Sequence, residues 1–241
     1  MAFSRSRLTT LQRRFLEAFV ARSSAFFLTG GAVLAGWVLG HRPTADLDLF
    51  TTDDGAMSDG DRLVRGAAAE VDATVEIVRS EPDFRRYLVR AVDEGLIVDL
   101  VRDRVPQLRP KVDRDGVLTD SVEEIVANKI CALVGRSEIR DLVDLYFLEQ
   151  AGFRVERFVA DAARKDGGVT PATVAWILSR VTIPRTLPEG VDVETLRAFA
   201  RDLEGRMRRL AARDPGSSAP ISEDRAPSVG NNKLDSPGLS C

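Results

Sequence analysis

The chain has 241 residues, of which 44% are hydrophobic and 29% are charged, and its formal net charge is −3. This length and apolar content suffice for one large domain or two modest ones, and they exclude a disordered or fibrous chain. The acidic balance, with a pI near 5.4, provides no overall attraction to nucleic acid. Such a partner would need a local basic patch.

Cysteine usage and hydropathy predict a soluble, cytoplasmic protein. Cys131 lies in a helical pattern and Cys241 at the terminus, so they form no disulfide framework, which fits a reducing compartment. The charged N-terminus is not followed by an apolar signal core, and no run reaches the roughly 18 apolar residues of a membrane span. Lysine is rare, which draws attention to Lys129.

The first half of the chain predicts a mixed sheet with flanking helices, because segments with helical and with strand patterns alternate. The expected helices are 8–22, 32–39 and 61–71. The expected strands are 25–28, 45–50, 74–79, 84–92 and 96–101. The sequence DEG between the last two strands favours a hairpin turn.

The second half has the pattern of helices only. These are expected at 121–134, 138–150, 155–165, 171–180 and 191–212. We therefore predict an α+β fold with a core over 1–115 and a helical region over 116–213 that completes the active-site cleft. The tail over 214–241 is rich in Pro, Ser, Gly and Asn and lacks periodicity, so it is expected to be disordered.

Two carboxylates stand one residue apart in the apolar segment ADLDLF. In a strand, alternate side chains share a face, so Asp46 and Asp48 project together with Cα atoms about 6.6 Å apart. Leu47 and Leu49 then point to the other face. Because unpaired buried acids are costly and hard cations take oxygen ligands, the pair predicts a Mg²⁺ or Mn²⁺ site that also meets substrate phosphates.

A third acid, Asp99, interrupts the apolar segment LIVDLV. An ionised carboxylate in a buried strand needs a cation or several donors. With Asp46 and Asp48 on adjacent strands, it would form one metal cluster. The alternative is that the acids pair with arginines. The candidates are Arg42, Arg86 and Arg90.

A glycine pair, Gly30 and Gly31, stands where a strand passes into a helix. Backbone N–H groups can approach phosphate oxygens where no Cβ intervenes, and a helix N-terminus adds a favourable dipole. A tight turn without a ligand is the competing interpretation. The acid pair downstream favours phosphate binding.

Lys129 lies near the middle of an apolar helical stripe, where a solvated lysine does not belong. Either its ammonium reaches a cleft, with the phosphate chain as its natural target, or it forms a buried ion pair. In the next helix, Arg140 and Asp144 are spaced to pair along the helix. The functional alternative puts Lys129 and Asp144 across the cleft from the metal acids. His41 is expected in a surface loop, with a ligand role as the alternative.

Three segments, LTGGAVLAGWVLGHRPTADLDLF, LIVDLV and VEEIVANKICALVGRSEIRDLVDLY, resemble the AbiEii/AbiGii toxin-like nucleotidyltransferases of the DNA polymerase β-like superfamily in order and spacing. The resemblance runs over about 26–149 and implies an NTP-dependent nucleotidyltransferase. Characterised members of the group are toxins of toxin–antitoxin systems, and some add nucleotides to tRNA 3′ ends. A type IV-like system, an antitoxin partner and a tRNA or other RNA acceptor are therefore expected.

Carried over by position, the resemblance implies that Gly30 and Gly31 hold the triphosphate. It also implies that Asp46 and Asp48 bind Mg²⁺ and that Asp99 is the third strand carboxylate. Gly31 stands where the wider superfamily has a serine, so phosphate binding is left to backbone donors.

The resemblance extends to residues before the acid pair and in the helices. Arg42 and Thr44 occupy positions of expected phosphate contacts. Lys129, Asp141 and Asp144 match the helical motifs, with Lys129 and Asp144 as expected catalytic residues and Asp141 as a nucleotide-binding one.

The predicted reaction is transfer of a nucleoside monophosphate from an NTP to a hydroxyl acceptor. Acceptor recognition is expected in the C-terminal helices, where arginines at 201, 206, 208 and 209 would contact phosphates. A solvated helix face is the alternative. Two other classes stay open, which are a small-molecule nucleotidyltransferase of the antibiotic-modifying kind and a non-catalytic nucleotide-binding protein.

Overall fold

The computed structural model describes residues 7–187 and 190–213. Within these ranges the strands form a seven-stranded mixed sheet with the order β3-β4-β5-β2-β1-β7-β6. The strands are β1 Phe27–Thr29, β2 Asp46–Thr51, β3 Thr74–Glu81, β4 Phe84–Arg90, β5 Gly95–Arg102, β6 Val112–Arg114 and β7 Val117–Thr119. The β4–β5 pair is antiparallel, which confirms the predicted hairpin.

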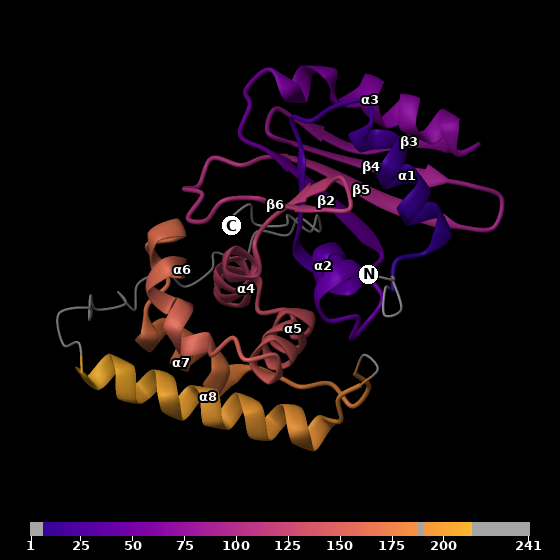
Figure 1. Cartoon of the computed structure of the whole chain (residues 1–241). Coiled ribbons are helices and arrows are strands. Elements are labelled where there is room, and N and C mark those ends of the chain that lie inside the picture. The colour runs from indigo at the N-terminus through magenta and orange to yellow at the C-terminus, as the bar shows by residue number, and fades with distance from the viewer. Residues whose placement is uncertain (1–6, 188–189, 214–241) are drawn as a thin grey trace, which may run out of the picture.

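Helices lie on both sides of the sheet, with α1 and α3 on one side and α4 to α8 on the other (Figure 1). The α-helices are α1 Thr10–Val20, α2 Gly30–Val33, α3 Ala56–Glu70, α4 Val122–Arg136, α5 Ile139–Gln150, α6 Val159–Lys165, α7 Pro171–Arg180 and α8 Val193–Arg213. The short elements are the π-helical η1 Leu34–Val38 and the 3₁₀-helical η2 Val155–Phe158. This arrangement confirms the predicted α+β class.

The register of the central strands decides which side chains meet. Asp48 of β2 lies opposite Thr29 of β1 on one side and Asp99 of β5 on the other. Asp99 in turn lies opposite Arg86 of β4. These four residues therefore form a row across the sheet, and the pleat directs them to one face.

The opposite face of β2 is apolar, as the alternation in ADLDLF predicts. Leu47 and Leu49 are fully buried. They belong to a hydrophobic cluster that also contains Ile130 of α4 and Leu203 of α8. The sheet and the helices beyond it therefore share a core. Within the two described ranges, no helix combines the length and apolarity needed to cross a membrane.

The structure departs from the sequence expectations at a few places. The hairpin of β6 and β7 was not predicted, since three-residue strands are too short to show alternation. Because β7 pairs with β1, the sheet continues to Thr119, past the boundary predicted near 115. The expected helix 32–39 starts earlier, at Gly30, and passes into a π turn. The tail predicted to be disordered, 214–241, lies outside the described residues.

Candidate active site

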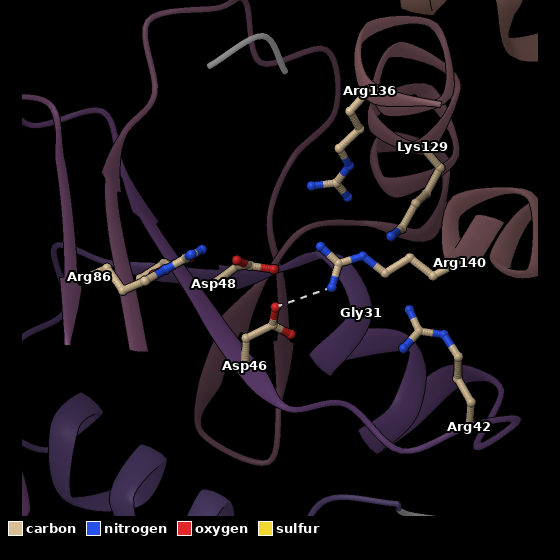
Figure 2. Close-up of a pocket in the computed structure, with 9 residues that line it drawn as sticks. Gly31, Arg42, Asp46, Asp48, Arg86, Lys129, Arg136 and Arg140 are labelled. Carbon is tan, nitrogen blue, oxygen red and sulfur yellow. Dashed lines mark hydrogen bonds and ion pairs between the residues drawn. The ribbon is translucent and has the colours of Figure 1, made fainter. Parts of the chain in front are cut away.

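Asp46 and Asp48 face a pocket of about 350 Å³ between the sheet and the helices α4 and α5. Figure 2 shows the two carboxylates on one side and the cationic side chains of Lys129, Arg136 and Arg140 on the other. The pocket is lined by Gly31, Arg42, Asp46, Asp48, Arg86, Asp99, Lys129, Arg136 and Arg140. The structure thus brings together residues that lie far apart in the sequence.

The two carboxylates of the pair have different surroundings. Asp46 accepts a hydrogen bond from Thr44 Oγ1 at 2.7 Å, and its Oδ2 lies 3.7 Å from Arg140 Nη1. Asp48 has no hydrogen bond or ion pair with any of the described residues. Burial, together with the nearby charges of Asp46 and Asp99, raises the pKa of Asp48 to about 7. An added cation would remove this electrostatic conflict.

The glycine pair fits closely around the acid pair. Gly30 has φ +65°, and a Cβ there would lie 2.7 Å from Asp48 Oδ2. A Cβ on Gly31 would lie 3.2 Å from Arg42 Nη2 and 3.3 Å from Thr44 Oγ1. Only glycine tolerates the first position without strain or displacement of the carboxylate. The backbone of the turn therefore lies directly beside the acid pair.

Asp99 is already neutralised by a protein cation. Its two oxygens accept from Arg86 Nε at 2.8 Å and from Arg86 Nη2 at 2.7 Å. The arginine pairing considered as the alternative for Asp99 is therefore present. Among the described residues, no group of three His, Cys, Asp or Glu side chains is arranged to hold a metal ion. Asp46 and Asp48 fit a divalent cation as a pair, and Asp99 as a third ligand stays a prediction.

Asp144 is fully buried and holds three cationic or polar side chains behind the pocket. It accepts from His41 Nε2 at 2.8 Å and from Arg42 Nε and Nη2 at 2.7 and 2.8 Å. Lys129 Nζ lies 2.7 Å from its other oxygen. Burial opposes its ionisation, but the Lys129 charge and the hydrogen bonds from His41 and Arg42 outweigh this and hold the pKa of Asp144 well below its usual range.

Asp141 completes this buried network from the preceding turn of α5. It binds Lys129 Nζ at 2.9 Å and Arg136 Nε and Nη2 at 2.9 and 3.0 Å. Lys129 is therefore held between two carboxylates, which raise its pKa against the opposing effect of burial. Of the two interpretations of Lys129, the buried ion pair is present, and the same ammonium lines the pocket.

Two sequence expectations need correction. His41 is not a surface residue, because its side chain is 2% exposed and bound to Asp144. Arg140 does not pair with Asp144 along the helix. Its guanidinium instead approaches Asp46 and binds Glu138 at 2.5 Å.

Three pocket cations were not predicted as site residues, namely Arg86, Arg136 and Arg140. The turn between α4 and α5 explains two of them, since Ser137 ends α4 in the left-handed conformation with φ 54°. This turn sets Arg136 and Arg140 on the same rim. The sequence RSEIRD, with two arginines flanking a helix break, carried that signal.

A carboxylate pair on a central strand, a glycine turn beside it and a rim of cations are the parts that nucleotidyl transfer requires. Fold and site place the chain in the class of nucleotidyltransferases. A sequence model described as "Nucleotidyl transferase AbiEii toxin, Type IV TA system" matches residues 14–220. The chain therefore belongs to the AbiEii family of nucleotidyltransferase toxins.

Two solved structures from Helicobacter pylori have a similar fold. One is JHP933, with a TM-score of 0.54 and 23% identity, covering 86% of this chain and 94% of its own. The other was solved as a candidate nucleotidyltransferase, with a TM-score of 0.55 and 23% identity, covering 83% of this chain and 94% of its own. At this identity the likeness concerns the fold alone. None of the curated proteins matches the chain.

Proposed function

We propose that the protein transfers a nucleoside monophosphate from an NTP to a hydroxyl acceptor, with Mg²⁺ or Mn²⁺ bound by Asp46 and Asp48. The acceptor oxygen bonds to the α-phosphorus, the bond from that phosphorus to the bridging oxygen breaks, and pyrophosphate leaves. The observation that carries the proposal is the carboxylate of Asp48, which lies beside Asp46, has no hydrogen bond or ion pair among the described residues and faces a pocket rimmed by cations.

The carboxylate pair suits a divalent cation chemically. Both side chains offer oxygen ligands from one strand face, and Thr44 orients Asp46 through its hydroxyl. When bound, the cation supplies positive charge to the phosphate oxygens and stabilises the leaving group. The raised pKa of Asp48 supports this assignment, because its ionised form lacks a partner among the described side chains.

The cations of the rim differ in how firmly they are held. Arg42 and Lys129 are fixed by the buried Asp144 and contribute positive charge without moving. Arg140 is the more adaptable cation, since it is 42% exposed, pairs with the exposed Glu138 and lies 3.7 Å from Asp46. We assign it to the triphosphate, which would draw it away from Asp46. The backbone N–H group of Gly31 is assigned as a further donor.

The acceptor hydroxyl is assigned to the side of the pocket formed by β4 and β5. Asp99 and Arg86 lie there as a bidentate pair, beside Asp48 in the sheet. Asp99 would orient the hydroxyl and receive its proton. Asp144 is the poorer candidate, because it is fully buried behind the pocket and does not line it, whereas Asp99 does. We therefore assign Asp144 to the positioning of cations.

The acceptor is assigned to RNA, with tRNA as the first candidate, and the protein to the toxin side of a cytoplasmic type IV-like system with a protein antitoxin. The family match supports the toxin class. The cation-rich pocket rim supports binding of a polyanionic substrate.

Incubation with each α-labelled NTP, Mg²⁺ and either total tRNA or aminoglycosides tests the proposal. Label is expected in RNA with wild type and is expected to be lost in the Asp46→Asn/Asp48→Asn double variant. Asp59→Asn is the matched control, because Asp59 is an exposed acid on α3. Label in the aminoglycoside would assign the small-molecule class. No label anywhere, with cellular effects unchanged in Asp48→Ala, would assign a non-catalytic nucleotide-binding protein.

A further inference from the structure

A groove between α7 and α8 carries an exposed aromatic side chain. It has a volume of about 580 Å³ and is lined by Ala172, Ala175, Trp176, Ser179, Arg208 and Ala211. Trp176 is 48% exposed, which is unusual for so large an apolar side chain. The small side chains on the groove floor leave room beside the indole ring for a flat ligand.

The surroundings of this groove are cationic. Arg180 lies over the Trp176 ring, with its guanidinium carbon 5.1 Å from the centroid. The last nine residues of α8, 205–213, contain four arginines and no acid, and α7 contains no acid at all. Glu204 pairs with Arg208 across one helical turn at 2.7 Å, an exposed contact of small energetic weight.

The four arginines of α8 that were predicted as phosphate contacts, at 201, 206, 208 and 209, have different surroundings in the structure. Arg206 is excluded, because it is buried and paired with Glu149, Glu156 and Asp202. Its role is to hold α8 against the preceding helices. The arginines at 201, 208 and 209 are exposed. Of these, Arg208 lines the groove and joins Trp176 and Arg180 as a candidate contact.

An exposed indole flanked by guanidinium groups has the chemistry of a nucleobase platform. Bases stack on aromatic faces whatever their sequence, and neighbouring arginines bind the phosphates. A protein partner would gain from the positive charge but would not need a half-exposed aromatic ring beside a floor of alanines. The charge and the shape together favour nucleic acid.

We propose that the groove between α7 and α8 binds a single-stranded segment of the RNA acceptor, with one base stacked on Trp176. This inference rests on the proposed function and extends it. Because α7 and α8 lie on the far side of α4 and α5 from the sheet (Figure 1), the acceptor must reach past the catalytic pocket. An acceptor that occupies both the groove and the catalytic pocket would be a polynucleotide and not a small molecule.

Tryptophan fluorescence provides a direct test. The chain has two tryptophans, so in a Trp37→Phe background Trp176 is the sole reporter. Titration with a single-stranded RNA of about 12 nucleotides is expected to quench it. In the otherwise unchanged chain, Trp176→Ala is expected to weaken binding of labelled RNA about tenfold and Trp176→Phe much less. Arg208→Gln is expected to weaken binding, and Arg62→Gln, which removes an exposed charge on α3, is not.

The outcomes separate this inference from the proposed function. Quenching by RNA with loss of affinity in Trp176→Ala supports it. Unchanged RNA affinity in Trp176→Ala, tighter binding of DNA of the same sequence, or protection of Trp176 only by a protein partner would overturn it. Nucleotide transfer with an unchanged KM for RNA in Trp176→Ala that disappears in Asp48→Asn would remove the groove and leave the catalytic proposal intact. Transfer that persists in Asp48→Asn would remove the catalytic proposal.

Discussion

Substitution of Asp48 by asparagine is expected to stabilise the metal-free protein at high pH. Asparagine keeps the shape of the side chain and removes its charge. In the wild type the folded-state pKa of Asp48 is raised from 3.8 to about 7 by burial and by the charges of Asp46 and Asp99. Folding therefore favours the protonated carboxyl. The stability that this protonated carboxyl contributes is complete below pH 3.8 and is lost as the pH rises through about 7.

The size of the effect follows from the shift. About three pKa units at about 1.4 kcal/mol each give an upper limit near 4 kcal/mol at pH 8. Asp48 is partly solvent-exposed, so water reduces the penalty, and about 2 kcal/mol is a reasonable lower value. At pH 4 the carboxyl is protonated in the folded state and roughly half protonated in the unfolded state, whose pKa is 3.8, so asparagine is expected to change little there.

Urea unfolding at pH 4 and pH 8, with chelator and then with Mg²⁺, measures this difference. Asp48→Asn should raise the free energy of unfolding by about 2 to 4 kcal/mol at pH 8 without Mg²⁺. Mg²⁺ should stabilise the wild type and leave the variant nearly unchanged. Asp59→Asn controls for the loss of an exposed acid. A variant that is less stable than wild type at pH 8, or a difference independent of pH, would refute the reasoning.

Three further variants test other parts of the site. Asp144→Asn leaves the buried Arg42 without its carboxylate and Lys129 with Asp141 alone, so we expect a loss of about 3 to 5 kcal/mol in urea unfolding. A loss below about 1 kcal/mol would contradict the network. In Gly30→Ala the alanine must adopt a left-handed conformation, and its Cβ crowds the Asp48 carboxylate. The substitution should therefore lower the free energy of unfolding by about 1 to 2 kcal/mol and lower nucleotide transfer, measured by label incorporation, more than tenfold. Normal transfer would contradict this geometry. Arg86→Gln removes the cation paired with Asp99, so this carboxylate becomes available to the ion held by the acid pair. Calorimetry should therefore find tighter Mg²⁺ binding. Weaker binding would show that Asp99 does not reach the cation.

Local periodicity was enough to predict the arrangement of the acid pair. Asp46 and Asp48 share a face because strand side chains alternate, and the burial of Leu47 and Leu49 confirms that alternation. The helical period also placed the charged Lys129 in an apolar stripe, which indicated that this side chain is buried.

The partners of these residues depended on tertiary pairing, which local patterns do not specify. Arg86 meets Asp99 only because β4 lies beside β5 in register. His41 is buried because Asp144 accepts its Nε2, and the loop sequence around His41 carries no sign of this contact. The β6–β7 hairpin was missed for a different reason, since its strands are too short to show a pattern.

Whether Asp48 holds the catalytic cation is tested by calorimetric titration of Mg²⁺ and a non-hydrolysable NTP analogue into wild type and into Asp48→Asn, paired with label transfer from each NTP to total RNA. We expect Mg²⁺ to bind the wild type, to strengthen analogue binding and to support transfer, and we expect all three effects to disappear in Asp48→Asn. Transfer at wild-type rates by the variant, or Mg²⁺ binding that does not depend on Asp48, would contradict this role of Asp48.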